Sequence, residues 1–408
     1  MPRIGFAYNQ KPESTAIARP DDETPRGDDE PPSSRRDAIA SRNSDAPASI
    51  ELAHSVTVGG DFTAPAHAAP ADDEFAEWDS ADTIDAVASA LSAYGDVIRL
   101  EANADFPQRL RDARPDIVFN IAEGLRGVNR EAHVPAICEF YGIPYSASDP
   151  FTCALCLDKA RTKEILAFHG VPTAAFSVVR EMRELGPGNR FPVSRFPVFV
   201  KPAYEGSSKG ITEANYCRTQ NELNTQVEFL LERYQQPVLI EEYLPGAEFT
   251  CAVLGNGDDA RVLPVVGMNF EALPEGALPV YGFEAKWIWD RPEKPLEIFE
   301  CPARITEELR CAIEQVVLRA YRVLGCRDWS RIDVRLDAAG KPNVVEVNPL
   351  PGILPNPADN SCFPKAARAV GMSYDELIQA CLLHAAERQG VELGVATSGV
   401  VATAATWR

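Results

Sequence analysis

The 408-residue sequence lacks several features that mark common protein classes. No apolar run reaches the ~18 residues that a membrane-spanning helix needs, so we expect no membrane segment. Basic residues are in deficit: 60 Asp and Glu against 40 Lys and Arg give a net charge of −20. This charge argues against nucleic acid or anionic membranes as partners. The first eight residues predict a β-strand and not a signal peptide.

Metal-cluster and redox patterns are also missing. The five histidines form no ligand cluster, and Cys153-x-x-Cys156 is the only close pair among the ten cysteines. Without a second pair or a neighbouring His, this pair is interpreted as core packing. Scattered, reduced cysteines are typical of cytoplasmic proteins, so we predict a cytoplasmic location.

The length is sufficient for two or three domains. Residues 10–73 are rich in Asp, Glu, Pro, Ser, Ala and Arg without periodicity, which predicts a disordered insertion. On either side of it, strands alternate with helices, which predicts a doubly wound parallel sheet. We therefore predict an N-terminal α/β domain over 1–150, with a boundary at Asp149-Pro150, and a disordered tail over 391–408.

The stretch from Arg331 to Asn348 carries the strongest chemical signal, because it predicts two alternating strands joined by a turn. In a register that opens the turn with Leu336 opposite Asn343, Asp333 lies opposite Glu346, and Arg331 lies opposite Asn348. Facing carboxylates repel each other unless a divalent metal binds between them. Hard oxygen ligands without His suit Mg²⁺ that also binds phosphate. The alternative is a solvated, charged face of the hairpin.

The remainder of this hairpin and the segment after it refine the hypothesis. Val345 and Val347 are expected to form the apolar face of the second strand. The sequence Pro349-Leu-Pro-Gly352 then breaks the strand and leaves backbone N–H groups near the proposed metal. Such amides could hold a developing oxyanion.

Two further segments suit a nucleotide. Glu205-Gly-Ser-Ser-Lys-Gly210 follows a strand that ends near Lys201, and its glycines, hydroxyls and amides suit phosphate. It matches neither the Walker nor the Rossmann pattern, and a surface turn is the alternative. Ile240 to Glu248 predicts a strand that ends at a hinge, where backbone groups could bind adenine. A single helix is expected over 151–169, with Lys159 and Lys163 on one side.

Together these segments resemble the ATP-grasp superfamily and, within it, the D-alanine–D-alanine ligase family. The resemblance spans roughly residues 115–387. The matching segments are Gly142-Ile-Pro-Tyr145, Leu157-Asp-Lys-Ala-Arg-Thr-Lys163, Phe199-Val-Lys-Pro202 with Glu205-Gly-Ser-Ser208, Leu239-Ile-Glu-Glu-Tyr-Leu244, Glu284-Ala-Lys286, Arg331-Ile-Asp-Val334, Glu346-Val-Asn348 and Pro351-Gly352.

The resemblance implies an ATP-grasp fold in which two α+β subdomains clamp ATP: a central one over 151–245 and a C-terminal one over 246–390 that holds the metal and phosphate site. Glu241 and Leu244 would lie near adenine and Glu248 near ribose, while the phosphates would contact lysines. The ATP-contacting residues implied are Lys159, Lys201, Glu205, Ser207, Ser208, Glu241, Glu242, Tyr243, Leu244, Glu248 and Lys286. Two Mg²⁺ ions, with Mn²⁺ as an alternative, would be held by Asp333, Glu346 and Asn348. The catalytic residues implied are Arg331, Gly352, Ser207 and Lys286.

The implied reaction joins two amino acids. A substrate carboxylate attacks the γ-phosphate of ATP, which gives an acyl phosphate and ADP, and an amine then displaces phosphate. Closure of the serine loop would protect the acyl phosphate from water. The partners implied are small-molecule amino acids, and a homodimer is an alternative to a monomer because the family includes dimers.

The departures from the family concern the substrate. The family's N-terminal Glu motif is absent, and Glu77 is its nearest substitute for holding the first ammonium. Glu123 stands where the family has His, and Trp287 stands where it has Tyr. Ser361 is expected to hold the second carboxylate. Three functions follow: D-alanine–D-alanine ligation, a dedicated amino-acid or peptide ligase of specialised metabolism, or a non-catalytic ATP-binding regulator.

Overall fold

The computed structural model describes residues 1–12, 75, 77–186, 195–274, 277–280, 282 and 296–394. Most of the predicted insertion over 10–73 and of the predicted tail over 391–408 lies outside these residues. Lys286 and Trp287 lie outside them as well. No helix in the described residues is long and apolar enough to cross a membrane.

The N-terminal domain is built on a three-stranded parallel sheet. Its order is β2 (Asp96–Glu101), β1 (Arg3–Tyr8) and β3 (Ile117–Asn120). One face packs against α1 (Ala81–Leu91), and the other packs against α2 (Phe106–Ala113) and α3 (His133–Tyr141). Helices on both faces of a parallel sheet confirm the predicted doubly wound arrangement.

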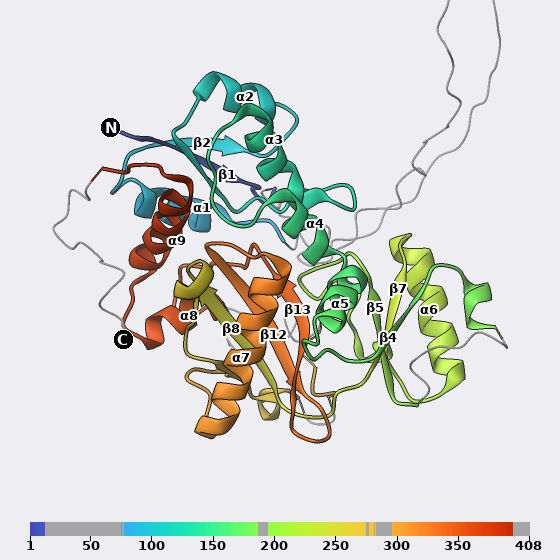
Figure 1. The fold of residues 1–408 in the computed structure, drawn as a ribbon. Helices are drawn as coiled ribbons and strands as arrows, with labels where there is room; N and C mark the ends of the chain where they lie inside the picture. Colours follow the sequence, from blue (N-terminus) through green and yellow to red (C-terminus); the bar gives the residue numbers. More distant parts are fainter. Residues whose placement is uncertain are drawn as a thin grey trace, which may run out of the picture. The chain divides into compact units, whose positions relative to one another are not determined.

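The last helix of the described chain completes this domain. α9 (Tyr374–Gln389) lies beside α1, although the two are far apart in the sequence (Figure 1). Leu377 and Leu382 on α9 share a buried cluster with Ile84 and Leu91 on α1. The chain therefore returns to its N-terminal domain after building the rest of the fold.

The second sheet is antiparallel, in the order β4 (Phe176–Val179), β7 (Val238–Glu242), β5 (Val198–Pro202) and β6 (Tyr216–Cys217). Leu223, Val227 and Leu230 of α6 (Gln220–Tyr234) pack on it, because their three- and four-residue spacing puts them on one side of the helix. The short 3₁₀ helices η2 (Met182–Leu185) and η3 (Glu213–Asn215) flank this sheet.

The third sheet has the order β11 (Phe299–Glu300), β10 (Val266–Met268), β8 (Glu248–Leu254), β12 (Trp329–Leu336) and β13 (Pro342–Asn348), with β9 (Arg261–Val262) beside β8. α7 (Glu307–Leu324) packs on this sheet, with Thr306 as its N-cap. The remaining short elements are η1 (Arg130–Ala132), η4 (Gly257–Asp259), η5 (Phe270–Ala272) and α8 (Cys362–Ala369).

The single helix predicted over 151–169 is wrong, because the structure has two helices there. α4 (Pro150–Leu157) ends at Asp158, and α5 (Lys159–Phe168) begins directly after it. Asp158 has an extended backbone, and its carboxylate accepts hydrogen bonds from the N–H groups of Ala160 and Arg161. This N-cap makes Lys159 the first residue of α5.

Candidate active site

The hairpin of β12 and β13 has the predicted facing pairs. Asp333 pairs with Glu346, and Arg331 pairs with Asn348. The turn differs from the prediction, because Leu336 pairs with Pro342 and a register shift follows Asp333. This β-bulge leaves Val345 without a partner on β12.

The bulge also changes which valines reach the core. Val344 and Val347 lie in the core cluster under the hairpin, whereas Val345 does not. Val345 instead lines a cavity between the second and third sheets, next to Glu346. The predicted core pair of Val345 and Val347 is therefore wrong at Val345, because alternation fails where an extra residue is inserted.

The predicted metal ligands leave several polar atoms without partners. Asp333 Oδ2 accepts a hydrogen bond from Arg331 Nη2 at 3.1 Å, but Asp333 Oδ1, Arg331 Nε and Asn348 Nδ2 have no partner among the described residues. A buried polar atom left unpaired costs about 1–3 kcal/mol, so this site is built to bind something. Two carboxylates and an amide oxygen fit Mg²⁺. The described residues offer no cluster of three His, Cys, Asp or Glu, so the fit requires Asn348.

Four lysines line the same cavity, and three of them, Lys159, Lys163 and Lys201, come from α5 and β5. Lys159 Nζ lies 2.7 Å from Glu346 Oε1 and also donates to the Glu205 carbonyl. Lys201 Nζ lies 2.7 Å from Glu241 Oε2, and Lys163 Nζ lies 2.6 Å from Glu241 Oε1. Lys159, Lys163 and Lys201 are thus each paired with a carboxylate from β7 or β13.

The lysines control the charge of both carboxylates. Burial alone would raise the pKa of Glu241, but Lys163 and Lys201 outweigh it and lower that pKa to about 2. Burial is likewise outweighed at Glu346, whose pKa is held below its usual value by Lys159 and Lys201. Both groups are therefore ionised at neutral pH.

Lys163 is missing from the predicted site. It lies one helical turn after Lys159 on α5, so the two side chains share one face. Its ammonium also donates to Thr173 Oγ1 at 2.6 Å. The spacing of the two lysines was the signal in the sequence that could have identified it.

The opposite end of the cavity is formed by the hinge between β7 and β8. Glu242, Tyr243, Leu244 and Glu248 line it, as predicted for adenosine-binding residues. The Leu244 N–H makes no hydrogen bond with the described part of the chain. Gly246 is required here, because a Cβ would lie 2.6 Å from Leu336 Cβ.

Arg335, which is missing from the predicted site, also lines this end. Its Nη1 lies 2.7 Å from Glu248 Oε2, and its Nε donates to the Leu244 carbonyl at 2.7 Å. Alternation along β12 places Arg335 on the same strand face as Asp333, and this alternation was the signal in the sequence.

The loop over 205–210, here called the phosphate loop, has an unusual backbone. Ser207 and Ser208 are both left-handed, with φ of 50° and 61°, which costs about 1 kcal/mol or more for each residue without glycine's freedom. Gly210 is also left-handed, and a Cβ there would lie 2.8 Å from Pro202 Cγ. Glu205 and Ser208 line the cavity.

Glu77 connects the phosphate loop to the N-terminal domain. Its carboxylate accepts hydrogen bonds from Arg130 Nη2 at 3.0 Å, Lys209 Nζ at 2.9 Å and the Gly206 N–H at 3.1 Å. Burial would raise the pKa of Glu77, but Arg130 and Lys209 outweigh it and lower that pKa. Arg130 and Lys209 are not among the predicted site residues; Lys209 lies within the predicted phosphate segment, whereas no local pattern distinguishes Arg130 from a surface cation.

Glu123 lies just beyond the end of β3 and makes no hydrogen bond or ion pair with the described residues. Burial and the neighbouring carboxylates of Glu77 and Glu131 raise its pKa well above the usual value. Gly124 packs against the backbone of Arg130, where a Cβ would lie 2.7 Å from the carbonyl oxygen. The structure thus brings Glu123 close to Glu77, as both substrate predictions require.

Ser361 and Gly352 are also brought together. The Ser361 hydroxyl donates to the Gly352 carbonyl at 3.1 Å and accepts from the Leu354 N–H at 3.2 Å. The Gly352 N–H makes no hydrogen bond within the described residues. The segment between them is therefore closed on itself by Ser361.

Comparison with known proteins agrees with this arrangement. Residues 165–383 match the family model described as the D-ala D-ala ligase C-terminus. The chain is 36% identical over 297 residues to the D-alanine–D-alanine ligase of Mannheimia succiniciproducens, covering 72% of this chain and 89% of that protein. The chain belongs to the D-alanine–D-alanine ligase family. It is also 37% identical to an uncharacterised protein of Sinorhizobium fredii, covering 65% of this chain and 73% of that protein.

Solved structures confirm the ATP-grasp fold. The D-alanine–D-alanine ligase of Bacillus anthracis matches with a TM-score of 0.60 at 20% identity, covering 96% of this chain and 99% of that chain. The same enzyme complexed with ATP matches with a TM-score of 0.58 at 23% identity, covering 76% and 96%. As a member of this family, the chain is an ATP-dependent ligase that forms a carbon–nitrogen bond.

Proposed function

We propose that this ligase joins two amino acids through an acyl phosphate, as a D-alanine–D-alanine ligase does. One observation carries the proposal: the cavity is lined by lysines and by Glu346, whose neighbour across the hairpin, Asp333, has a carboxylate oxygen without a partner in the described residues, while the Leu244 amide lines the hinge. A nucleotide fits this polarity, with its phosphates at the cationic end. The named function of the relatives in Mannheimia and Bacillus supports the same reaction.

The adenosine of ATP would bind at the hinge. The Leu244 N–H is available to donate to the adenine ring, and Glu248 can accept from a ribose hydroxyl. Lys159 and Lys201 would move from their carboxylate partners to phosphate oxygens, which neutralises charge as ADP leaves. Glu205, Ser207 and Ser208 would close over the γ-phosphate, with Lys286 as a predicted further contact.

Two Mg²⁺ ions are the proposed metals, with Asp333, Glu346 and Asn348 as ligands. When bound, they would polarise the phosphate oxygens and stabilise the charge that develops on them. Asp333 Oδ1, which has no protein partner, is the oxygen most directly available. Arg331 lies across the ladder from Asn348 and can stabilise the oxyanion on the acyl carbon, together with the Gly352 N–H.

The residues proposed to bind the amino acids are compatible with two kinds of substrate. Ser361 would bind the carboxylate of the second amino acid, and Glu77 or Glu123 would bind the ammonium of the first. Glu77 already has three donors, whereas Glu123 is partly buried and accepts no hydrogen bond from the described residues. This difference favours Glu123 for the ammonium. It also supports the second candidate, a dedicated ligase for amino acids other than D-alanine.

The ten cysteines are all free thiols, seven of them buried, which supports the predicted cytoplasmic location of the enzyme. A homodimer remains a prediction.

ADP release in the presence of ATP and Mg²⁺ tests the function, measured across single D- and L-amino acids and their pairs. Turnover with D-alanine alone is expected for D-alanine–D-alanine ligation, and turnover only with another pair would show a dedicated ligase. Lys159→Met should abolish release. Arg161→Met on the exposed side of the same helix is the matched control and should not. Silence of the wild type with every amino acid would contradict the proposal.

A further inference from the structure

Arg335 connects all the parts of the hinge end of the cavity. Its side chain is buried, and four of its five N–H groups donate hydrogen bonds to this end. Nη1 donates to Glu248 Oε2 at 2.7 Å and Nε donates to the Leu244 carbonyl at 2.7 Å. Nη2 donates to the Tyr243 hydroxyl at 2.9 Å and to the Pro279 carbonyl at 3.0 Å.

Two aromatic rings fix the plane of the guanidinium. Its carbon lies 5.0 Å from the ring centre of Tyr243 and 5.6 Å from that of Phe270. Both distances fall within the range of cation–π attraction. The fork of Arg335 therefore has one orientation, and Glu248 receives its ion pair from a fixed direction.

Glu248 depends on this ion pair for its charge. The carboxylate is largely buried, and burial raises its pKa in spite of Arg335, which lowers it. Arg335 is its ion-pair partner among the described residues. The other carboxylate oxygen, Oε1, accepts no hydrogen bond from that part of the chain. Glu248 Oε1 is thus left as a hydrogen-bond acceptor for a ligand in the cavity. The bond from Arg335 to Oε2 fixes its position.

We propose that Arg335 is a positioning residue for the nucleotide. It holds Glu248 in the orientation that accepts a hydrogen bond from a ribose hydroxyl, and so makes the enzyme select ribonucleotides over deoxyribonucleotides. This inference rests on the proposed function, which places adenosine at the hinge. A residue that only braced the fold would not affect the choice between two nucleotides that differ by one hydroxyl.

Calorimetric binding of ADP, 2′-deoxy-ADP and 3′-deoxy-ADP with Mg²⁺ tests the inference without any turnover. The wild type is expected to bind ADP at least about tenfold more tightly than one of the deoxy forms, because a hydrogen bond to a charged group contributes that much. In Arg335→Met, which keeps the length without the donors, the ratio should fall to near unity. Arg335→Lys keeps the charge without the fork and should give an intermediate ratio.

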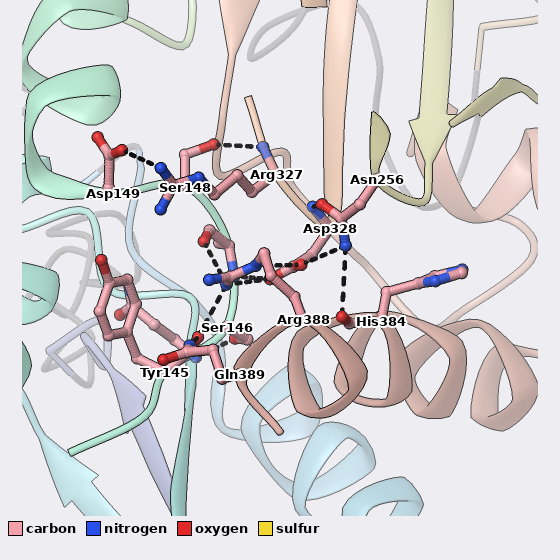
Figure 2. Close-up of polar contacts among 12 residues, drawn as sticks. Tyr145, Ser146, Ser148, Asp149, Asn256, Arg327, Asp328, His384, Arg388 and Gln389 are labelled. Carbon is pink, nitrogen blue, oxygen red and sulfur yellow. Dashed lines mark hydrogen bonds and ion pairs between the residues drawn. The ribbon is translucent and has the colours of Figure 1, made fainter. Parts of the chain in front are cut away.

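Arg388→Met is the matched control. Arg388 also pairs with a buried carboxylate, Asp328, at 2.8 Å (Figure 2), and neither residue lines the cavity. It should lower the melting temperature and leave the ADP to deoxy-ADP ratio unchanged. An unchanged ratio in Arg335→Met, or the same fall in Arg388→Met, would overturn the inference. If Arg335→Met does not fold, a wild-type ratio in Arg335→Lys overturns it instead.

The outcomes for the wild type separate the two proposals. Binding of ADP without any preference over both deoxy forms overturns the role of Arg335 and leaves the ligase function standing. Preference for ADP without turnover of any amino acid contradicts the ligase function and leaves the role of Arg335 standing. Failure of the wild type to bind ADP contradicts both.

Discussion

Two arginine–carboxylate groups lie along one strand, β12, one just before its first residue and one in its middle, and they differ in whether their polar atoms all have hydrogen-bonding partners. Asp328, which precedes β12, accepts hydrogen bonds from Arg388 Nε and Nη2, Asn256 Nδ2 and the Ala147 N–H, at 2.8–2.9 Å. These donors come from α9, the β8 end and the segment that leaves the N-terminal domain (Figure 2). Asp328 is fully buried and fully partnered.

The group at Asp333 is incomplete. One carboxylate oxygen is paired with Arg331, while Asp333 Oδ1, Arg331 Nε and Asn348 Nδ2 remain unpaired. A closed network of charges stabilises a fold, whereas an open one costs free energy until a ligand completes it. The comparison therefore separates a structural network from a binding site, although both use the same types of residue.

The largest effect is expected for Asp333→Asn, which should lower the rate of ADP release about 10³-fold, since loss of several kcal/mol of metal-assisted charge stabilisation has this effect. The melting temperature should stay close to that of the wild type, because the residue is not fully partnered. Steady-state kinetics and thermal melting measure the two quantities. A lower melting temperature with unchanged turnover would contradict this, because the Asp333 group would then be a structural network and not a binding site.

Asp328→Asn should show the opposite behaviour. Loss of the charge leaves Arg388 without its partner, and breaking a buried pair costs about 3–5 kcal/mol in the free energy of unfolding. Turnover per folded molecule should not change. Urea denaturation gives the first quantity, and kinetics below the melting temperature give the second. If activity is lost without loss of stability, the Asp328 network is not purely structural.

Glu241 makes the cavity itself sensitive to acid. Its folded pKa of about 2 lies below the unfolded value of about 4.3, so its ionisation stabilises the fold above about pH 5, and this stability is lost as the pH falls. The difference in unfolding free energy between wild type and Glu241→Gln should shrink by roughly 2 kcal/mol between neutral pH and pH 3. Urea titrations of both proteins at each pH measure it. A difference that does not depend on pH would contradict the assigned ion pairs.

The smallest effect is expected for Gly206→Ala in the phosphate loop. A Cβ there would lie 2.5 Å from Glu77 Oε1, so the carboxylate must shift away from its donors. We expect ADP release to fall about tenfold, because small misplacements in a catalytic loop have effects of this order. The shorter side chain of Glu77→Asp in the same protein should recover part of the loss. No recovery would show that the contact with Glu77 is not the cause.

Much of this molecule was predictable from its sequence because its signals are local. Alternation along β12 and β13 predicted that Asp333 faces Glu346, and the motifs around Lys201 and Glu241 predicted the fold. The β-bulge at Val345 was not predictable, because nothing in the local pattern marks the inserted residue. The break between α4 and α5 at Asp158 was not predicted, because an apolar helical run that contains an N-cap residue resembles the sequence of one continuous helix.

The contacts of Glu77 could not be predicted from the sequence, for a different reason. Arg130 and Lys209 meet it only because the N-terminal domain and the phosphate loop approach each other in three dimensions. Arg335 and Lys163 could have been predicted from the sequence, since each lies on the same face as a predicted residue of its own element. Periodicity therefore identifies the neighbours of a known site residue, but not the partners that come from other elements.

The most direct test of the central claim uses an amino acid whose carboxylate carries ¹⁸O, chosen as the one that gives ADP in the substrate panel. The released phosphate is then analysed by mass spectrometry. An acyl phosphate transfers one carboxylate oxygen to the phosphate. One ¹⁸O atom is therefore expected in the product phosphate for each bond formed. Phosphate without ¹⁸O would contradict it, because the carboxylate would then not have attacked the γ-phosphate.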